Sequence, residues 1–325
     1  MTVKEKMINL FELNRGTYLS GEEIAKKLEV SRAAVWKAVN KLKEEGYPIK
    51  AVTNKGYCLS EDTDILSVQG IQKYLNAECD FLEMEILPTV DSTNSYTWKK
   101  AGEGAKDGYT VIAREQTVGR GRTGRVFFSP KETGIYISTL LRPIGYNANQ
   151  ALQITTMAAV AICEAIEEVS DSHPQIKWVN DVFIHGKKVC GILTEASFSL
   201  ESGLLDYAVL GLGMNVYSPM DGFPKEIQKI AGAISETPKT DFKNQLAAAF
   251  LRHFVEYYKK ADQKAYISKY REYSLLINKD IYVIQGKEKK KALAYDINED
   301  CQLLVRYEDG TQEKLSYGEV QIVNR

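Results

Sequence analysis

The chain has 325 residues, more than one typical domain of roughly 150 residues, which predicts two or three domains. With 44% hydrophobic and 26% charged residues, the composition is globular and excludes a largely disordered, collagen-like or repeat-biased chain. The 42 basic residues nearly balance the 43 acidic ones, so any binding to a polyanion must come from local clusters of charge.

Targeting and metal signals are weak in this sequence. The longest unbroken hydrophobic run, residues 157–163, has seven residues, whereas a membrane span needs roughly 18 or more. No apolar segment follows the charged residues 4–6, so the N-terminal sequence does not resemble a signal peptide. Five cysteines without a Cys-x-x-Cys pair argue against a disulfide framework, and only three histidines argue against structural zinc. We expect a cytoplasmic protein without membrane contact.

The first part of the chain predicts helices at short spacing. Apolar residues recur at helical intervals over residues 3–13, and Ser20 with Glu23 is a capping box in front of a second helix. A third helix begins at Ser31 and ends before Gly46. Because only two or three residues separate the second and third helices, the pattern is that of a helix-turn-helix.

A short hairpin follows these helices. Residues 48–52 and 57–59 predict two strands joined through a turn at Asn54, Lys55 and Gly56, which would form a wing. Between residues 31 and 57 there are six basic and two acidic residues, a local charge of +4. This basic face favours DNA binding. The residues that we expect to contact DNA are Ser31, Arg32, Lys37, Lys41 and Lys55. Two alternatives are a solvated three-helix packing domain and a winged helix used for protein contacts.

Residues beyond the wing predict an α+β chain of several domains. An acidic stretch at residues 61–64 is expected to be a linker. Strand-like and helix-like segments then mix, which indicates a central mixed α/β domain. These segments are strands 135–141, 189–194 and 205–212 and helices 150–169 and 241–260. Short β-rich runs near the C-terminus, with an Asp309-Gly310 turn, predict a small β-barrel. The expected boundaries are 1–62, 63–271 and 272–325.

The sequence Gly-Arg-Gly-Arg-Thr-Gly-Arg at residues 119–125 is the most unusual stretch. Glycines allow close approach to a ligand, and arginines offer forked donors that match phosphate oxygens. The stretch also matches Gly-x-Gly-x-x-Gly, but a strand rather than a helix is predicted after it, and the acidic residue that reads a ribose is missing. We therefore favour a phosphate-binding loop over a dinucleotide-binding turn. A flexible basic surface loop is the remaining alternative.

Three further clusters combine polar residues with strand ends or glycines. Residues 177–181, Lys-Trp-Val-Asn-Asp, carry groups suited to phosphate charge, adenine and a divalent metal, although an ion pair beside a hairpin would look similar. Glycines in residues 211–215 suggest close approach of a ligand or, alternatively, a β-bulge. Hydroxyls in residues 91–94 could bind a small polar ring or cap a helix.

Taken in order, these motifs resemble those of the bacterial bifunctional biotin protein ligases that also repress the biotin operon. The resemblance covers essentially the whole chain: a winged helix, Asp-Ser-Thr-Asn, Gly-Arg-Gly-Arg-x-Gly-Arg, Lys-Trp-x-Asn-Asp, Gly-Ile-Leu-x-Glu, Gly-x-Gly-x-Asn and a small β tail. This sequence departs from the family at Val179, where proline is usual, and at Phe127, where tryptophan is frequent. Neither departure removes a charged or hydrogen-bonding group.

The resemblance implies a two-step reaction with biotin and ATP as substrates, together with Mg²⁺. The biotin carboxylate attacks the α-phosphate of ATP, which gives bound biotinoyl-5′-AMP and pyrophosphate, and a lysine of an acceptor protein then attacks the mixed anhydride. The implied acceptor is the biotin carboxyl carrier domain of acetyl-CoA carboxylase or pyruvate carboxylase. The implied regulatory partner is operator DNA, bound by a homodimer with biotinoyl-5′-AMP as corepressor. The implied C-terminal fold is an SH3-like barrel.

The resemblance also assigns roles to individual residues. The implied catalytic residues are Lys188, Arg122, Lys177 and Asp181, of which Asp181 would help hold Mg²⁺; sequence does not rank Lys177 against Lys188. The implied biotin-binding residues are Ser92, Thr93, Gln116, Gly119, Arg120, Arg122, Lys188, Gly191, Leu193, Gly211 and Gly213. The implied adenylate-binding residues are Arg120, Arg122, Arg125, Phe127, Asn180 and Asn215. We further expect the arginines to repel one another until a phosphate gathers them, so that their loop acts as a lid.

Two other functions remain open at this stage. One is a ligand-sensing repressor without catalysis, against which the arginine loop, Lys188 and Asp181 argue, because a sensor of biotin needs no triphosphate-handling groups. The other is a ligase for lipoate or octanoate, against which the helix-turn-helix and the Gly-Arg-Gly-Arg loop argue.

Overall fold

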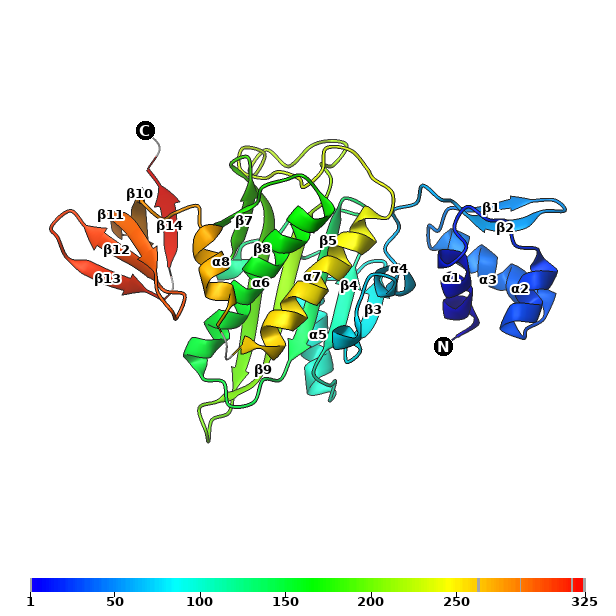
Figure 1. Cartoon of the computed structure of the whole chain (residues 1–325), viewed down its shortest axis with the longest axis horizontal. Helices are drawn as coiled ribbons and strands as arrows, with labels where there is room; N and C mark the ends of the chain where they lie inside the picture. The colour runs from blue at the N-terminus through cyan, green and yellow to red at the C-terminus, as the bar shows by residue number, and fades with distance from the viewer. Residues whose placement is uncertain (1, 262–263, 287, 317, 324–325) are drawn as a thin grey trace. The chain divides into compact units, whose positions relative to one another are not determined.

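In this computed structural model, residues 2–261, 264–286, 288–316 and 318–323 are described. The chain forms two compact units. Unit 1 consists of Met1–Leu75 with Thr237–Ala248, and unit 2 consists of Asn76–Glu236 with Ala249–Arg325. Figure 1 labels the helices and strands of both units.

Unit 1 contains the winged helix. Its elements are α1 (Val3–Glu12), α2 (Gly21–Leu28), α3 (Arg32–Glu44), β1 (Ile49–Val52), β2 (Gly56–Leu59), α4 (Val68–Gln72) and the first residues of α7 (Phe242–Lys259). The expected helices and wing are confirmed, with β1 and β2 paired antiparallel. Ser20 caps α2 by accepting a hydrogen bond from the Glu23 N–H at 3.0 Å. The reciprocal capping box belongs to α1, between Thr2 and Glu5.

A single apolar cluster holds the winged helix together. Met7, Phe11, Ile24 and Leu42 are at most 1% exposed, and each such buried side chain stabilises the fold by about 1.5–3 kcal/mol. Ile65 joins the same cluster. The expected linker at residues 61–64 is therefore wrong in part, because Thr63 and the apolar residues directly after residue 64 are buried. The acidic composition indicated solvent exposure but did not reveal the packing of the following residues.

Unit 2 is built on a seven-stranded sheet in the order β3-β4-β5-β9-β8-β7-β6. The strands are β3 (Glu83–Leu87), β4 (Tyr109–Ala113), β5 (Gly134–Leu141), β6 (Gln175–Lys177), β7 (Asp181–Ile184), β8 (Lys187–Phe198) and β9 (Leu205–Asn215). Only β3 and β4 pair in parallel, and the other neighbours are antiparallel. The mixed sheet confirms the expected α+β class. The strand β5 after the arginine loop also confirms the argument against a dinucleotide-binding turn.

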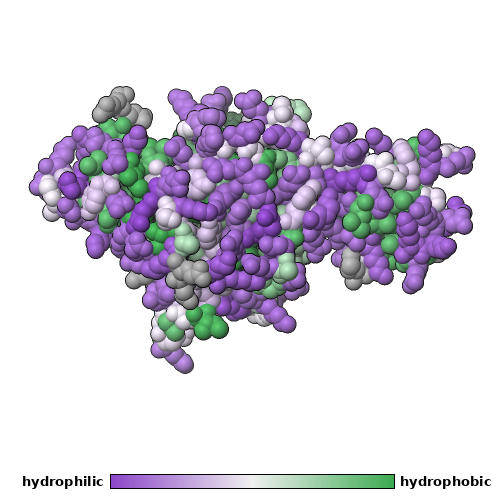
Figure 2. All heavy atoms as spheres, in the orientation of Figure 1, coloured by the Kyte–Doolittle hydropathy of each residue, from purple (hydrophilic) through white to green (hydrophobic). Residues whose placement is uncertain are grey.

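Unit 2 also contains several helical segments. They are η1 (Ala77–Cys79), α5 (Thr93–Gly102), η2 (Arg122–Gly124), α6 (Ala148–Val169), α8 (Tyr266–Glu272) and the rest of α7. Figure 1 shows α6 and α7 running side by side across one face of the sheet, and α6 packs on β8 and β9. Over these helices, the surface in Figure 2 is mostly hydrophilic, as expected of helices that bury only one face. Among the described residues, no helix combines the length and the apolar character needed to cross a membrane.

The C-terminal residues form a small antiparallel sheet in the order β13-β12-β11-β10-β14. The strands are β10 (Lys279–Gln285), β11 (Glu288–Ile297), β12 (Leu303–Tyr307), β13 (Gln312–Leu315) and β14 (Glu319–Ile322). The expected small β domain is confirmed. It is fixed to the rest of unit 2, since the Trp178 indole N–H donates to the Cys301 carbonyl oxygen at 2.9 Å. The boundaries at residues 62 and 271 stay predictions. All five cysteines are free and buried.

Candidate active site

Two glycines on neighbouring strands form a flat patch under an aromatic ring. Gly191 of β8 is paired directly with Gly213 of β9. A Cβ atom on Gly213 would lie 2.6 Å from Cε1 of Phe127, and one on Gly191 would lie 3.3 Å from Cε2 of the same ring. These glycines therefore leave room for Phe127 to lie against the backbone, which is the close approach that the sequence indicated. We call Gly191, Gly213 and Phe127 the platform.

The other two glycines predicted to line a biotin pocket make room for protein atoms. A Cβ atom on Gly211 would lie 1.9 Å from Oδ1 of Asn94. A Cβ atom on Gly119 would lie 2.3 Å from the Phe127 carbonyl oxygen and 2.5 Å from Oγ of Ser129. Packing within the chain is thus sufficient reason for glycine at both positions.

A buried hydrogen-bond cluster surrounds the start of α5. Oε1 of Gln116 accepts from the Thr93 N–H at 2.8 Å and from the Thr93 hydroxyl at 3.0 Å, while Nε2 of Gln116 donates to Ser129 at 2.9 Å. These contacts fix which way the Gln116 amide points. Ser92 acts as the N-cap of α5, accepting from the Ser95 N–H at 3.4 Å. The structure therefore gives Ser92 the capping role that the sequence left as the alternative.

Four residues of this cluster had no role assigned from the sequence: Asn94, Ser129, Ser138 and Glu195. The Ser138 hydroxyl of β5 contacts the Thr93 hydroxyl at 2.8 Å and Oδ1 of Asn94 at 2.6 Å. The Asn94 amide donates to Glu195 at 3.0 Å and to the Leu193 carbonyl oxygen at 3.3 Å. Asn94 ends the Asp-Ser-Thr-Asn motif and Glu195 ends the Gly-Ile-Leu-x-Glu motif, so these motifs could have identified both residues from the sequence. Ser138 and Ser129 belong to no motif, and a serine in an ordinary strand or loop cannot be distinguished from them by sequence alone.

The arginine loop is folded on itself. The Gly121 N–H donates to the Arg125 carbonyl oxygen at 2.7 Å, and the Phe127 N–H donates to the Gly119 carbonyl oxygen at 2.9 Å. Within the turn, Thr123 and Gly124 both have positive φ, 53° and 74°. Glycine is suited to this conformation, whereas threonine adopts it only with strain.

Each arginine of the loop has its own protein partner. Arg120 pairs with Glu195 at 2.9 Å, and Nη1 of Arg122 donates to Oδ1 of Asn180 at 2.9 Å. Arg125 pairs with Glu319 of β14 at 2.7 Å, and 67% of its side chain is exposed. The three guanidinium groups are thus held apart by separate acceptors, in agreement with the expected repulsion, and their gathering around a phosphate stays a prediction. Arg122 and Arg120 contact residues of the central sheet region, and Arg125 contacts the C-terminal sheet.

Lys188 and Asp181 form an ion pair beside the platform. Nζ of Lys188 lies 2.6 Å from Oδ1 of Asp181, and both side chains are about one quarter exposed, 29% and 24%. A Cβ atom on Gly191 would lie 3.2 Å from the same ammonium group. The ammonium group is therefore close to the platform and accessible to solvent. Asn180 is fixed nearby, because its side chain donates to the Ile192 carbonyl oxygen at 2.8 Å.

Lys177 lies on β6, the edge strand of the sheet. Its Nζ is 5.9 Å from the centroid of the Phe183 ring. The Cα register pairs Lys177 with Asp181, so the two residues share a face of the sheet. The contacts with Gly191 and Asp181 nevertheless belong to Lys188, and this ranks Lys188 ahead of Lys177 as the cation at the platform.

A short segment after β9 contacts two of the predicted site residues. The Lys188 N–H donates to the Ile230 carbonyl oxygen at 2.7 Å, and the Gly232 N–H donates to the Lys188 carbonyl oxygen at 2.9 Å. The Asn215 side chain donates to the Gly232 carbonyl oxygen at 3.1 Å. The Asn215 carbonyl oxygen in turn accepts from the Ile234 N–H at 2.9 Å. We call residues 230–235 the strap.

The predicted DNA-contacting residues are all exposed and lie on α3 or the wing. Ser31 caps α3 by accepting from the Ala34 N–H at 3.2 Å. Arg32, Lys37 and Lys41 project from α3, whose opposite face is buried, and Lys55 lies in the turn between β1 and β2. This arrangement gives a helix and a hairpin tip that both carry positive charge, as DNA-binding winged helices do.

The three parts of the chain thus define a class: a ligase-type mixed α/β domain that carries a helix-turn-helix domain before it and a small β domain after it. The biotin/lipoate A/B protein ligase family matches residues 86–215, an HTH domain matches residues 3–58, and the biotin protein ligase C-terminal domain matches residues 276–323.

Individual relatives agree with this class. The bifunctional ligase/repressor BirA of Bacillus spizizenii is 36% identical over 235 residues, covering 72% of this chain and 71% of the relative. The protein of the same name from Escherichia coli is 28% identical and covers 99% of this chain and 97% of the relative. The chain belongs to the family of bifunctional ligase/repressor BirA proteins.

A solved structure of a biotin protein ligase from Aquifex aeolicus, in complex with biotin and ATP, also resembles this chain. Its TM-score is 0.63 at 27% sequence identity, and the match covers 75% of this chain and 100% of that one.

Proposed function

We propose that the chain is an ATP-dependent biotin protein ligase that also binds DNA as a repressor. The observation that carries the ligase proposal is the position of the Lys188 ammonium group beside both the platform and the carboxylate of Asp181. A cation next to an aromatic ring and glycine backbone suits a substrate that combines a compact ring system with a carboxylate.

The proposed reaction has two steps. First, a carboxylate oxygen of biotin attacks the α-phosphorus of ATP, so that the bond to pyrophosphate breaks and biotinoyl-5′-AMP forms. Next, the neutral amine of an acceptor lysine attacks the acyl carbon, an amide bond forms, and AMP leaves. No covalent intermediate with the enzyme is needed, so the protein must position the substrates and stabilise the charge that develops on phosphate oxygens.

The proposed roles follow from where the side chains lie. Lys188 would neutralise charge where the carboxylate meets the α-phosphate. The platform and the Thr93–Gln116 cluster would hold biotin, with Ser92 and Leu193 beside them. Phe127, which the resemblance implied for the adenylate, is thereby proposed to contact biotin as well, because its ring lies against Gly191 and Gly213. Arg120 and Arg122 would exchange their present partners for the adenylate, near Asn180 and Asn215. We propose a weaker role for Arg125, because it is largely exposed and pairs with Glu319.

Mg²⁺ would enter with ATP. In proteins this ion is usually held by one or two carboxylates together with substrate phosphates. Oδ1 of Asp181 is buried and already lies 2.6 Å from the Lys188 ammonium group, so this oxygen has a cationic partner that a metal ion could replace. The described residues contain no group of three acidic, His or Cys side chains that could hold a metal on its own. We therefore propose Asp181 as a single protein ligand to a metal that is otherwise bound by phosphate.

The winged helix is proposed to bind operator DNA as part of a homodimer. A local charge of +4 is small for tight binding by one copy, since specific affinity draws on several phosphate contacts as well as base contacts. Two copies on a two-fold site would double these contacts. Biotinoyl-5′-AMP is the proposed corepressor, and a biotin carboxyl carrier domain of acetyl-CoA carboxylase or pyruvate carboxylase is the proposed acceptor. ATP, the acceptor and DNA are found together in the bacterial cytoplasm, where we propose that the protein acts.

Pyrophosphate exchange tests the ligase proposal. Purified protein with ATP, Mg²⁺ and labelled pyrophosphate should exchange label into ATP when biotin is added, and should then attach biotin to one lysine of a carrier domain. Lipoate and octanoate serve as matched controls. Exchange supported by lipoate but not by biotin would show that the substrate is wrong, and no exchange with any acid would favour a sensor without catalysis.

Footprinting tests the repressor proposal. On DNA upstream of biotin synthesis or transport genes, we expect paired half-sites whose occupancy rises when biotin and ATP are added. Equal occupancy with and without these substrates would eliminate the corepressor role.

A further inference from the structure

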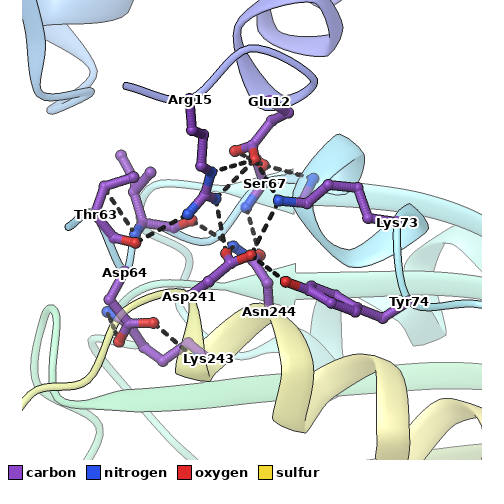
Figure 3. A network of polar contacts seen from close by, with 12 residues as sticks. Glu12, Arg15, Thr63, Asp64, Ser67, Lys73, Tyr74, Asp241, Lys243 and Asn244 are labelled. Atoms are coloured by element: carbon purple, nitrogen blue, oxygen red, sulfur yellow. Dashed lines mark hydrogen bonds and ion pairs between the residues drawn. The ribbon is translucent and has the colours of Figure 1, made fainter. Parts of the chain in front are cut away.

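Unit 1 contains a buried network of charged residues outside the candidate active site and outside the DNA-contacting face (Figure 3). Its centre consists of two carboxylates, Glu12 and Asp241, and two cations, Arg15 and Lys73. The Glu12 and Asp241 side chains are 0% and 6% exposed, and that of Arg15 is 11% exposed. Since buried charges are costly unless they are paired, this neutral group of four must be held together closely. We call it the latch.

The contacts within the latch are short and shared. Arg15 pairs with Glu12 and with Asp241 at 2.7 Å each. Lys73 contacts the same two carboxylates at 2.8 and 3.0 Å. Each cation thus bridges both anions. Tyr74 adds a hydrogen bond from its hydroxyl to Oδ2 of Asp241 at 2.6 Å.

A shell of neutral groups fixes the latch further. The Asn244 amide donates to Oδ1 of Asp241 at 2.7 Å, and its carbonyl oxygen accepts from the Ser67 N–H at 3.1 Å. The Ser67 hydroxyl contacts Oε1 of Glu12 at 3.2 Å. A Cβ atom on Gly70 would lie 2.6 Å from the Asn244 amide nitrogen, so glycine is needed where α4 meets this shell. These contacts favour one arrangement of the segments rather than a loose association.

The latch joins the winged helix to the start of α7. Glu12 is the last residue of α1, and Arg15 lies in the turn after it. Asp241 directly precedes α7, 226 residues from Arg15 in the sequence. Only five residues separate Asp241 from Ser235, the last residue of the strap, which is hydrogen-bonded to Lys188 and Asn215 in the candidate active site. The strap and the latch are therefore joined by a very short piece of chain.

We propose that Arg15 and Asp241 are positioning residues for DNA binding, through which the ligand state of the active site reaches the winged helix. This proposal rests on the proposed function. When substrate or adenylate engages Lys188 or Asn215, the hydrogen bonds of the strap change, and the strap carries the change to Asp241. Because the latch is packed and fully paired, the shift moves α1 instead of being absorbed locally. The coupling between ligand and DNA then depends on the latch.

The test compares operator affinity of the full chain without and with biotin, ATP and Mg²⁺. The ratio of the two Kd values measures the coupling, and typical couplings are about 5- to 150-fold. In Arg15→Met, which keeps the apolar length but removes both ion pairs, the ratio should fall to near one, while biotin transfer to a carrier domain stays at the parent rate. Tyr74→Phe, which removes one hydrogen bond and no charge, should reduce the ratio partly.

Lys4→Met is the matched control. Lys4 pairs with Glu45 at 2.8 Å within the same winged helix but outside the latch, so its loss should leave the ratio unchanged. Amide hydrogen exchange gives a second readout that needs no DNA. In the parent protein, biotin with ATP should change the exchange rate of residues 3–15, and this change should be absent in Arg15→Met.

The outcomes separate this proposal from the proposed function. If the parent chain shows no ligand effect on DNA binding, both proposals are overturned. If the parent shows the effect and folded Arg15→Met keeps it, only the latch is overturned. If Arg15→Met loses DNA affinity equally with and without ligand, the role of Arg15 is purely structural, and the proposed coupling through the latch is overturned. If Arg15→Met does not fold, Tyr74→Phe replaces it in the test. The latch proposal is then overturned if Tyr74→Phe has the same Kd ratio and the same ligand-induced change in hydrogen exchange as the parent protein.

Discussion

The Lys188 ammonium group lies 2.6 Å from the carboxylate of Asp181, so a cation that we place at the reacting atoms is partnered before any substrate arrives. This pairing has a chemical consequence. The phosphate of ATP must compete with Asp181 for Lys188, and a metal ion that binds Asp181 would release Lys188 toward the phosphate. The two charges are therefore expected to act together rather than as separate sites.

Lys188→Ala should suppress adenylate synthesis. It removes positive charge where the carboxylate and the α-phosphate meet, and it leaves Asp181 as an unpaired carboxylate next to an anionic substrate. Loss of one such stabilising group typically lowers kcat by about 100- to 1,000-fold. Pyrophosphate exchange measures the effect. Lys177→Ala is the matched control, with an expected loss several times smaller, and a larger loss in Lys177→Ala would reverse the ranking of the two lysines.

Replacing the platform glycines should affect biotin binding unequally. In Gly213→Ala the new Cβ atom would lie 2.6 Å from Phe127, so the ring must move, whereas in Gly191→Ala the nearest atoms would lie 3.2 Å away. We expect a clearly larger increase of the KM for biotin in Gly213→Ala, with the KM for ATP changed less. Steady-state kinetics with each substrate varied provides the measurement. Equal effects of the two substitutions on the KM for biotin would show that Phe127 does not contribute to biotin binding.

Local patterns in the sequence predicted the winged helix and part of unit 2, but they did not locate β4, β6 or β7 of the central sheet. Helical spacing and caps located α1, α2 and α3, and β-rich runs located β5, β8 and β9, since these signals lie within a few residues of each other. The prediction of a linker at residues 61–64 was wrong in part because it, too, used only local information. Their composition is local, but the burial of Ile65 depends on the whole apolar cluster of the winged helix.

The candidate site could be predicted as a set of residues but not as a geometry. The motifs identified Gly191, Gly213 and Phe127 separately, whereas their stacking depends on the register between β8 and β9. Likewise, nothing near Arg122 in the sequence indicates that Asn180 accepts its hydrogen bond. Arg15 and Asp241 show the extreme case, because an ion pair between residues 226 positions apart leaves no local pattern.

Arg122→Gly should shorten the lifetime of bound adenylate more than it slows synthesis. Arg122 donates to Asn180, the residue directly before Asp181, so its guanidinium group is held against the sheet instead of free in solvent. A side chain in that position can cover a mixed anhydride and exclude water from it. Single-turnover formation of labelled adenylate, followed by a chase, measures release. Arg125→Ala is the control, expected to remain within about two-fold because exposed ion pairs such as Arg125–Glu319 contribute little.

Asp241→Asn should destabilise unit 1 in a pH-dependent way. Burial alone would raise the pKa of Asp241, but hydrogen bonds from Tyr74, Asn244 and Lys73, together with the charge of Arg15, lower this pKa below its ordinary value of 3.8. A carboxylate whose pKa is lowered by folding stabilises the native state at pH values above its ordinary pKa, and this contribution is lost as the pH falls through the lowered value.

The difference in unfolding free energy between the parent and Asp241→Asn should therefore be complete at pH 6 to 7. Breaking a buried pair typically costs about 3–5 kcal/mol, because the remaining charges lose their partner. Below a pH of about 4, where Asp241 becomes protonated in the unfolded chain, the difference should decrease. Urea unfolding of both proteins at several pH values, followed by circular dichroism, measures it. Glu22→Gln, at an exposed position of α2, controls for the loss of an acidic residue as such. A difference that stays constant from pH 7 down to pH 3 would show that Asp241 contributes through its shape and hydrogen bonds and not through its charge.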